Sequence, residues 1–150
     1  MKKYTLKNLV NDESALGNDN QMTEERVQGF IRENSEVINE EQGYMYFKYQ
    51  GMKMVLLSDI KHNRMRIISP ITAYSKLAPK IKDNLMQSNF HKALDARYAV
   101  SEDTLYSCFI HPLSSLTKED LESALKQVSN LTLSFGKTYS SGQLDFTNKK

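Results

Sequence analysis

The fold of this chain is decided by Lys82–Gly136, which reads KDNLMQSNFHKALDARYAVSEDTLYSCFIHPLSSLTKEDLESALKQVSNLTLSFG. The stretch opens with an amphipathic helical pattern that ends in Leu85–Phe90. Residues on either side of a Ser-Glu-Asp turn at 101–103 then alternate between apolar and polar, as short strands do. Thr117 follows as a helix-capping residue in front of a long apolar stripe. We therefore predict the local order helix, strand, strand, helix.

The two strands and the last helix can be placed more closely. Alternation over Leu94–Val100 predicts a strand with one more polar face, and Leu105–Ile110 predicts the next strand. Thr117 and Asp120 form the pattern of a capping box, with Asp in the place of the usual Glu. The helix that they begin is expected to stop before Gly136.

Upstream of this stretch, the sequence predicts a further helix. Thr23 can cap it, and apolar residues at helical spacing continue through Val37 and Ile38, with Gly43 beyond the end. Another helix is expected to start near Ser75, to carry Pro79 in its early part and to finish near Phe90.

Between these two helices the apolar period changes from 3.6 to two, which indicates strands joined by tight turns. The three predicted strands are Tyr44–Tyr49, Met52–Ser58 and Arg64–Ile68. The complete order is α-β-β-β-α-β-β-α, so the predicted fold class is α+β, an antiparallel five-stranded sheet with helices packed on it. We expect a flexible N-terminal arm over residues 1–22, a single domain over 23–136 and a disordered tail over 137–150.

Composition indicates an ordinary water-soluble domain. The chain has 150 residues, 39% hydrophobic and 25% charged, and its formal charge of +2 is too small to demand a nucleic-acid or membrane partner. No stretch is apolar enough to be a secretory signal or to span a bilayer. Cys108 is the only cysteine, which fits a reducing compartment and favours a cytoplasmic location.

Several predicted strands carry apolar side chains on both faces, whereas three short helices readily cover only one face of a sheet. We therefore expect a second copy of the chain or a bound polypeptide to cover part of the remaining area, and we predict a homodimer. The candidate partner or dimer surface comprises Met45, Phe47, Met52, Met54, Leu56, Tyr106, Cys108 and Ile110. Methionine-rich surfaces can repack against varied partners, but methionine also fills irregular cores, so an ordinary core is the alternative interpretation.

The residues expected of an enzyme are missing from the pattern. Cys108 and His111 would lie on opposite faces of a continuing strand, which disfavours a metal site, and a thiol in an apolar strand is usually inert. There is no phosphate-binding loop and no hydrolase or zinc-protease motif. We expect no enzyme activity, no cofactor and no metal. The alternative is a small-molecule sensor or enzyme whose polar site includes Asp95, Arg97 and His91, which are close in sequence.

Nucleic-acid binding is disfavoured as well. The basic cluster Lys61–Arg66 is short, lies at a predicted turn and has no clear aromatic stacking platform beside it.

The element order over Thr23–Phe135 resembles two families of bacterial proteins, the Tir chaperone (CesT) type of type III secretion chaperone and the YbjN family. The resemblance is most specific at Leu85–Phe90 and at His111–Leu113 with Leu116, Thr117, Glu119, Leu121 and Leu125. Membership would imply a small cytoplasmic protein, often dimeric, that binds a segment of another polypeptide without nucleotide or metal. The chain is basic whereas secretion chaperones are typically acidic, so the YbjN side is favoured. The resemblance thus implies a peptide-binding chaperone or regulatory adaptor.

Overall fold

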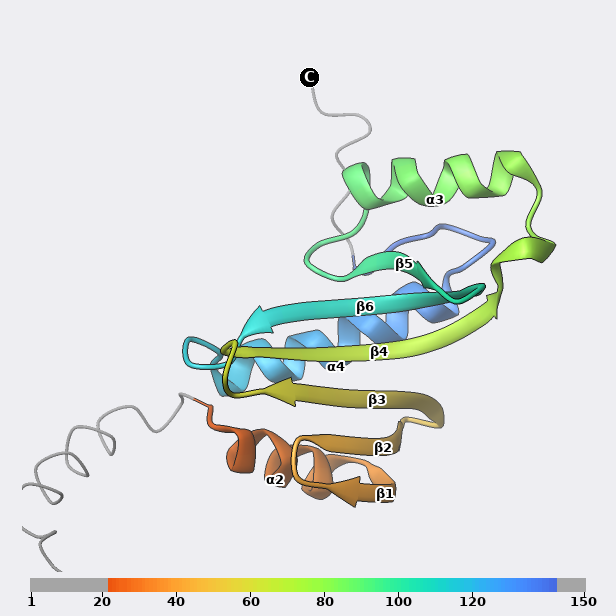
Figure 1. Ribbon diagram of the computed structural model, residues 1–150. Coiled ribbons are helices and arrows are strands. Elements are labelled where there is room, and N and C mark those ends of the chain that lie inside the picture. The colour runs from red at the N-terminus through yellow and green to blue at the C-terminus, as the bar shows by residue number, and fades with distance from the viewer. Residues whose placement is uncertain (1–21, 143–150) are drawn as a thin grey trace, which may run out of the picture.

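The computed structural model describes residues 22–142, and Figure 1 shows their arrangement. In chain order the elements are α2 Glu24–Asn34, β1 Glu36–Glu41, β2 Tyr44–Tyr49, β3 Met52–Asp59, β4 Arg64–Ala73, the 3₁₀ turn η1 Tyr74–Lys76, α3 Pro79–His91, β5 Arg97–Ser101, β6 Thr104–Pro112 and α4 Lys118–Leu133. The expected α+β class with an antiparallel sheet is confirmed, and the sheet is open. The expected strand number is wrong, because the sheet has six strands in the order β1-β2-β3-β4-β6-β5.

The additional strand is β1, which the sequence pattern assigns to the end of the first helix. The helix α2 ends at Asn34, and Glu36–Glu41 pairs antiparallel with β2. Val37 and Ile38 fall at helical spacing from the residues before them, but both are β-branched and suit a strand. Gly43 has a φ of +80° and lies in the tight turn between β1 and β2, so it closes a hairpin and does not cap a helix.

The strand β5 begins at Arg97, three residues later than the alternation predicts. The backbone N–H of Leu94 donates to Ser141 Oγ, and those of Asp95 and Ala96 donate to Gln127 Oε1 at 2.8 and 3.0 Å. These amides are therefore satisfied by side chains, and the ladder with β6 starts only after them.

The helix starts differ in how well the sequence predicts them. Ser75 does not cap α3, because its side chain and backbone N–H bond the carboxylate of Asp103, and α3 starts at Pro79 behind Ala78. The capping box of α4 is confirmed, with Thr117 Oγ1 accepting from the Asp120 N–H and Asp120 Oδ2 accepting from the Thr117 N–H.

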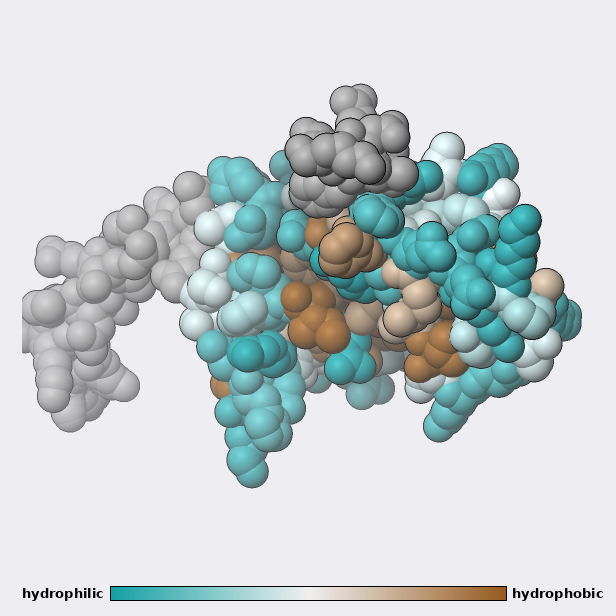
Figure 2. Space-filling model, turned by 90° about the horizontal axis from the view of Figure 1, so that it is seen from above, coloured by the Kyte–Doolittle hydropathy of each residue, from teal (hydrophilic) through white to brown (hydrophobic). Residues whose placement is uncertain are grey.

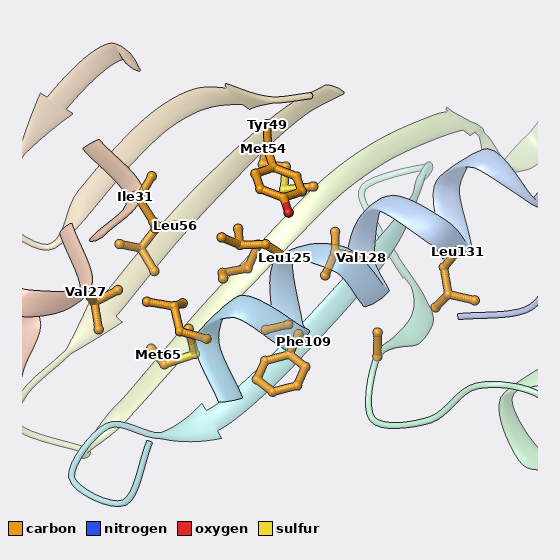
Figure 3. Packing of buried hydrophobic residues seen from close by; sticks show 14 of the residues in the cluster. Val27, Ile31, Tyr49, Met54, Leu56, Met65, Phe109, Leu125, Val128 and Leu131 are labelled. Carbon is orange, nitrogen blue, oxygen red and sulfur yellow. The ribbon is translucent and has the colours of Figure 1, made fainter. Parts of the chain in front are cut away.

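The core lies between one face of the sheet and the helices α2 and α4. In Figure 1 α4 crosses behind β4 and β6, and Figure 3 shows Val27 and Ile31 of α2 close to Leu56, with Leu125 and Val128 of α4 beside them. We call this side of the sheet the packed face. The helix α3 lies beyond the β5 edge, and only its residues Leu85 and Ser88 are buried.

Both ends of the described chain belong to the packed structure. Met22, which the sequence places in the flexible arm, is 6% exposed, and its N–H donates to the carbonyl of Leu116. Residues 137–142, expected to be disordered, fold back so that Tyr139 and Ser141 are buried. The rest of the expected arm and tail, residues 1–21 and 143–150, lies outside the described residues.

Candidate functional site

The sheet face opposite the core carries apolar side chains that no helix buries. We call it the open face. The strand register places Tyr46, Val55, Ile68 and Cys108 side by side across β2, β3, β4 and β6, and all four are half-buried. Neighbouring strands lie about 4.8 Å apart, so these side chains form one continuous apolar stripe across the sheet.

A second row of the open face runs parallel to this stripe. Tyr44, Leu57, Arg66 and Ile110 are successive partners in the register. Leu57 is 40% exposed and Ile110 is 52% exposed. Between them the surface forms a hollow of about 310 Å³, whose lining includes Leu57, Met65 and Ile110 together with Arg64 and Arg66. An exposed apolar area with a polar rim is the usual form of an interaction surface.

The structure divides the predicted partner surface between the two faces. Tyr106, Cys108 and Ile110 lie on the open face. The other five candidates, Met45, Phe47, Met52, Met54 and Leu56, lie on the packed face, where all but the half-buried Met52 are fully buried. Within one strand, the alternation of side chains shows which residues share a face. Only the pairing register between strands shows which residues of the next strand lie on that same face. Met45, Phe47, Met54 and Leu56 are therefore part of the hydrophobic core in this conformation.

Several open-face residues were not among the predicted candidates. Tyr44, Tyr46, Val55 and Leu57 alternate with the packed residues of β2 and β3, and Ile68 joins them from β4. The sequence signal for them is that the odd-numbered and the even-numbered positions of these strands are both apolar, so that each strand has apolar side chains on both faces.

The open face also carries positive charge. Lys48, Lys53 and Arg66 lie on it, and within residues 22–142 their side chains form no hydrogen bond or ion pair. The opposing carboxylates Glu36 and Glu41 lie on the edge strand β1. The middle of the open face is therefore apolar and cationic.

Cys108 lies in the apolar stripe as a free thiol. Burial raises the pKa of this thiol above its ordinary value, and the nearby guanidinium of Arg66 only partly opposes that effect. A raised pKa lowers the fraction of reactive thiolate, so the chemistry here is that of a packing residue and not of a nucleophile.

A separate group of exposed apolar side chains lies at the α3 end of the molecule. Met86 and Phe90 are one helical turn apart and are 70% and 76% exposed. Val100 of the neighbouring strand β5 is also exposed. Viewed from the α3 side, apolar side chains gather in the middle of the surface among hydrophilic ones (Figure 2).

The helix α3 also covers the backbone edge of β5. The amide of Asn89 accepts from the Tyr98 N–H at 2.9 Å and donates to the Tyr98 carbonyl at 3.1 Å, as a neighbouring strand would. This end of the sheet is closed to strand pairing at Tyr98, so contacts there depend on side chains.

The polar residues proposed for a small-molecule site do not share one pocket. Asp95 accepts from Gln127 Nε2 of α4, and the Arg97 guanidinium donates to the carbonyls of Leu94 and Ala96. His91 lines a different hollow of about 360 Å³, whose lining contains neither Asp95 nor Arg97. Its Nδ1 atom is buried without a hydrogen-bond partner in the described part of the chain.

A hollow of about 440 Å³ between α2 and β1 is lined mainly by acidic side chains. Its Gln28, Arg32 and Glu40 side chains are hydrogen-bonded to one another. Arg32 bonds both carboxylate oxygens of Glu40, and Gln28 bonds Glu40, the carbonyl of Glu41 and the N–H of Gly43. Hydrogen bonding by Arg32 lowers the pKa of the Glu40 carboxyl. This network fastens α2 to the β1–β2 hairpin.

Two further observations limit the chemistry of the described residues. No three His, Cys, Asp or Glu side chains among residues 22–142 converge to hold a metal ion. In the same range no helix is long and apolar enough to cross a membrane.

An antiparallel sheet with helices on one face and an apolar, open second face defines the structural class of this protein. Solved structures share this fold. They include a chain of the ExsC–ExsE complex, with 18% identity and a TM-score of 0.51 over 62% of this chain and 73% of that one. A chain of the HopA1–SchA chaperone–effector complex has 10% identity and a TM-score of 0.56 over 73% and 88%.

The third structure is the type III secretion chaperone SycH of Yersinia pestis in complex with a fragment of YscM2, with 13% identity and a TM-score of 0.54 over 73% of this chain and 95% of that one. At these identities the likeness establishes the fold. No protein-family model matches the sequence, and comparison with curated proteins finds no significant match.

Proposed function

We propose that this protein is a non-enzymatic polypeptide-binding module, a chaperone or regulatory adaptor that holds a segment of another protein on the open face. The observation that carries the proposal is the apolar stripe from Tyr46 to Cys108, half-buried on a face that no helix covers. The fold supports it, because the three solved structures compared above are complexes with a second polypeptide.

The choice between the two families that the sequence resembles rests on the charge of the protein. A formal charge of +2 and a cationic open face favour a YbjN-like regulator or adaptor over an effector chaperone of the type III secretion class. We place the protein in the bacterial cytoplasm, where its single cysteine would stay reduced.

The proposed assembly is a homodimer formed at the α3 end. Met86 and Phe90 are the two most exposed large apolar side chains of residues 22–142, and they lie on one side of the helix. A two-fold contact that joins these side chains to those of a second copy would remove them from water and leave the open face free.

Site-specific cross-linking tests the proposed function. The photoreactive amino acid p-benzoylphenylalanine replaces Ile110 on the open face or, as a matched exposed control, Leu133 of α4. In native cells the Ile110 position should yield an adduct with a different polypeptide, identified by mass spectrometry, and the Leu133 position should not. If Ile110 yields only an adduct with a second copy of this chain, or if both positions yield the same adducts, the proposal is wrong.

A small-molecule sensor is the second candidate, supported by one observation. The Nδ1 atom of His91 is buried and unpartnered beside a hollow that also contains Lys92, Lys137 and Tyr139. A bound metabolite that bonds His91 should raise the melting temperature, and His91→Ala should abolish the shift. If no metabolite in a screen raises the melting temperature in this way, the small-molecule sensor is ruled out and polypeptide binding is the remaining candidate.

A further inference from the structure

We propose that the open face selects polypeptide segments in which an acidic residue stands two positions away from a large apolar residue. The apolar side chain would enter the hollow between Leu57 and Ile110, and the carboxylate would meet Arg66. This inference rests on the proposed function and specifies the chemistry of its partner.

The hollow joins an apolar lining to an unpaired cation. Arg66 stands between Leu57 and Ile110 in the strand register, so its guanidinium emerges beside the apolar side chains. Guanidinium groups bind carboxylates through two parallel hydrogen bonds, and an apolar surrounding strengthens such contacts. One extended segment can reach both features, because side chains two residues apart point to the same side.

The carboxylate already present in the hollow does not neutralise Arg66. Asp59 accepts hydrogen bonds from the backbone N–H of His62 at 3.1 Å and from the His62 ring at 2.7 Å. These hydrogen bonds lower the pKa of Asp59, which is therefore ionised and committed to the turn between β3 and β4. The guanidinium of Arg64 donates to the carbonyl of Asn63, whereas the Arg66 side chain has no such partner within residues 22–142.

Other cations extend the same preference. Lys48 and Lys53 face each other in the β2–β3 register, on the other side of the apolar stripe from Arg66. An incoming segment that crosses the stripe would meet positive charge on both sides, so acidic residues on it would be attracted and basic residues repelled.

A polypeptide fits this face better than a single-stranded nucleic acid. Tyr44, Tyr46 and Tyr106 could stack bases, but the aliphatic side chains of Val55 and Ile68 separate Tyr46 from the β6 side. Glu36 and Glu41 border the face on β1 and would repel phosphates. The stripe therefore offers apolar contact where a nucleic acid needs a continuous run of cations.

Fluorescence anisotropy with labelled short peptides tests the inference. The peptides repeat the four residues Leu-Ser-X-Ser, where X is aspartate, asparagine or lysine, so that leucine and X point to the same side of an extended segment. We expect the Leu/Asp peptide to bind about tenfold more tightly than the Leu/Asn peptide, which is the effect of one charge-assisted pair partly screened by water, with the Leu/Lys peptide weakest. Added salt should narrow these differences.

Two charge-reversal variants test whether the preference for the Leu/Asp peptide depends on Arg66. Arg66→Glu should abolish the preference for the Leu/Asp peptide, whereas Lys126→Glu on the exposed side of α4 should preserve it. Both positions are exposed, and circular dichroism verifies that both variants fold.

Three results would overturn the inference: equal binding of the Leu/Asp and Leu/Asn peptides, an unchanged preference in Arg66→Glu, or tighter binding of oligothymidylate than of the Leu/Asp peptide. Equal binding of the two peptides leaves the proposed function intact, because apolar contact alone would then hold the partner. The cross-links from position 110 decide that function independently.

Discussion

Leu56 and Leu57 are consecutive residues of β3 with the same side chain, yet Leu56 is fully buried and Leu57 is 40% exposed. Their difference is that between the two faces of the sheet. On the packed face α2 and α4 provide the apolar neighbours, as Figure 3 shows around Leu56. On the open face the apolar residues have only their strand neighbours.

The polar groups of the two faces differ in the same way. On the packed face the hydroxyls of Ser107 and Tyr98 donate to the carbonyls of Val128 and Leu131 in α4, so buried polar atoms are satisfied within the chain. On the open face the side chains of Lys53 and Arg66 have no hydrogen-bond or ion-pair partner in the described part of the chain. Apolar area on the first face stabilises the fold, whereas on the second it remains available for contact with another molecule.

The largest expected effect comes from substituting the two leucines separately. Leu56→Ala should lower the free energy of unfolding by about 2–5 kcal/mol, because it removes fully buried methyl groups and leaves a cavity. Leu57→Ala should cost less than about 1 kcal/mol, because its side chain is already partly in water. Urea denaturation followed by circular dichroism measures both values. Equal losses would show that the open face contributes to folding as much as the packed face does.

The next effect concerns the pH dependence of the packed face. Burial raises the pKa of the Tyr98 hydroxyl, and the nearby Tyr139 acts in the same direction. The native state therefore keeps this proton after the unfolded chain begins to lose it near pH 10, so the stabilisation is complete below that pH and falls as pH rises above it. The free energy of unfolding should therefore fall, through Tyr98 alone, by an amount that approaches about 1.4 kcal/mol per pH unit.

The variant Tyr98→Phe isolates this contribution. Its free energy of unfolding should decline less steeply than that of the unsubstituted protein between about pH 10 and 11. Parallel declines would mean that the Tyr98 hydroxyl titrates normally and that this part of the packed face admits water.

The sequence predicts the elements whose signals are local and misses those that depend on distant partners. Thr117 and Asp120 cap each other within four residues, so the start of α4 can be predicted from the pattern alone. The sequence pattern does not reveal the strand β1, because Val37 and Ile38 also fit a helical period and only pairing with β2 decides between helix and strand. The alternation wrongly places Leu94 in a strand, because its backbone N–H donates to Ser141 Oγ, far along the chain, and not to a neighbouring strand.

The division of the candidate surface has the same origin. Each strand's alternation shows that Leu56 and Leu57 face opposite ways, and Tyr106 and Leu105 likewise. Which of them share a face depends on the order β3-β4-β6 and on a register irregularity between Pro70 and Thr72. These are tertiary properties, which a period in one strand cannot determine.

A smaller effect is expected at the helix that covers the packed face. Thr117→Ala removes the side-chain acceptor for the Asp120 N–H and should lower the free energy of unfolding by about 1 kcal/mol. The matched variant Thr23→Ala removes the corresponding bond to the Arg26 N–H of α2. Thermal unfolding compares the two variants. A negligible loss in Thr117→Ala would show that packing alone fixes the start of α4.

The smallest expected effect is a change in reaction rate at Cys108, which reports on the open face directly. Because burial raises the pKa of this thiol, its alkylation by iodoacetamide at neutral pH should be slower than that of a small free thiol. Arg66→Gln removes the one opposing charge, so the thiolate fraction and the rate should fall further, while unfolding stays unchanged.

The concentration dependence of the same rate separates the two ways of covering apolar area. A homodimer that joins Met86 and Phe90 of two copies leaves Cys108 as accessible as in the monomer, so the rate should not change as dimers form. A dimer through the open face would instead protect the thiol as protein concentration rises. Light scattering on the same samples reports the mass, and Phe90→Asp should return the mass to that of one chain. Protection of Cys108 that persists in Phe90→Asp would place the dimer contact on the open face, and the polypeptide partner would then have to compete with a second copy for the same surface.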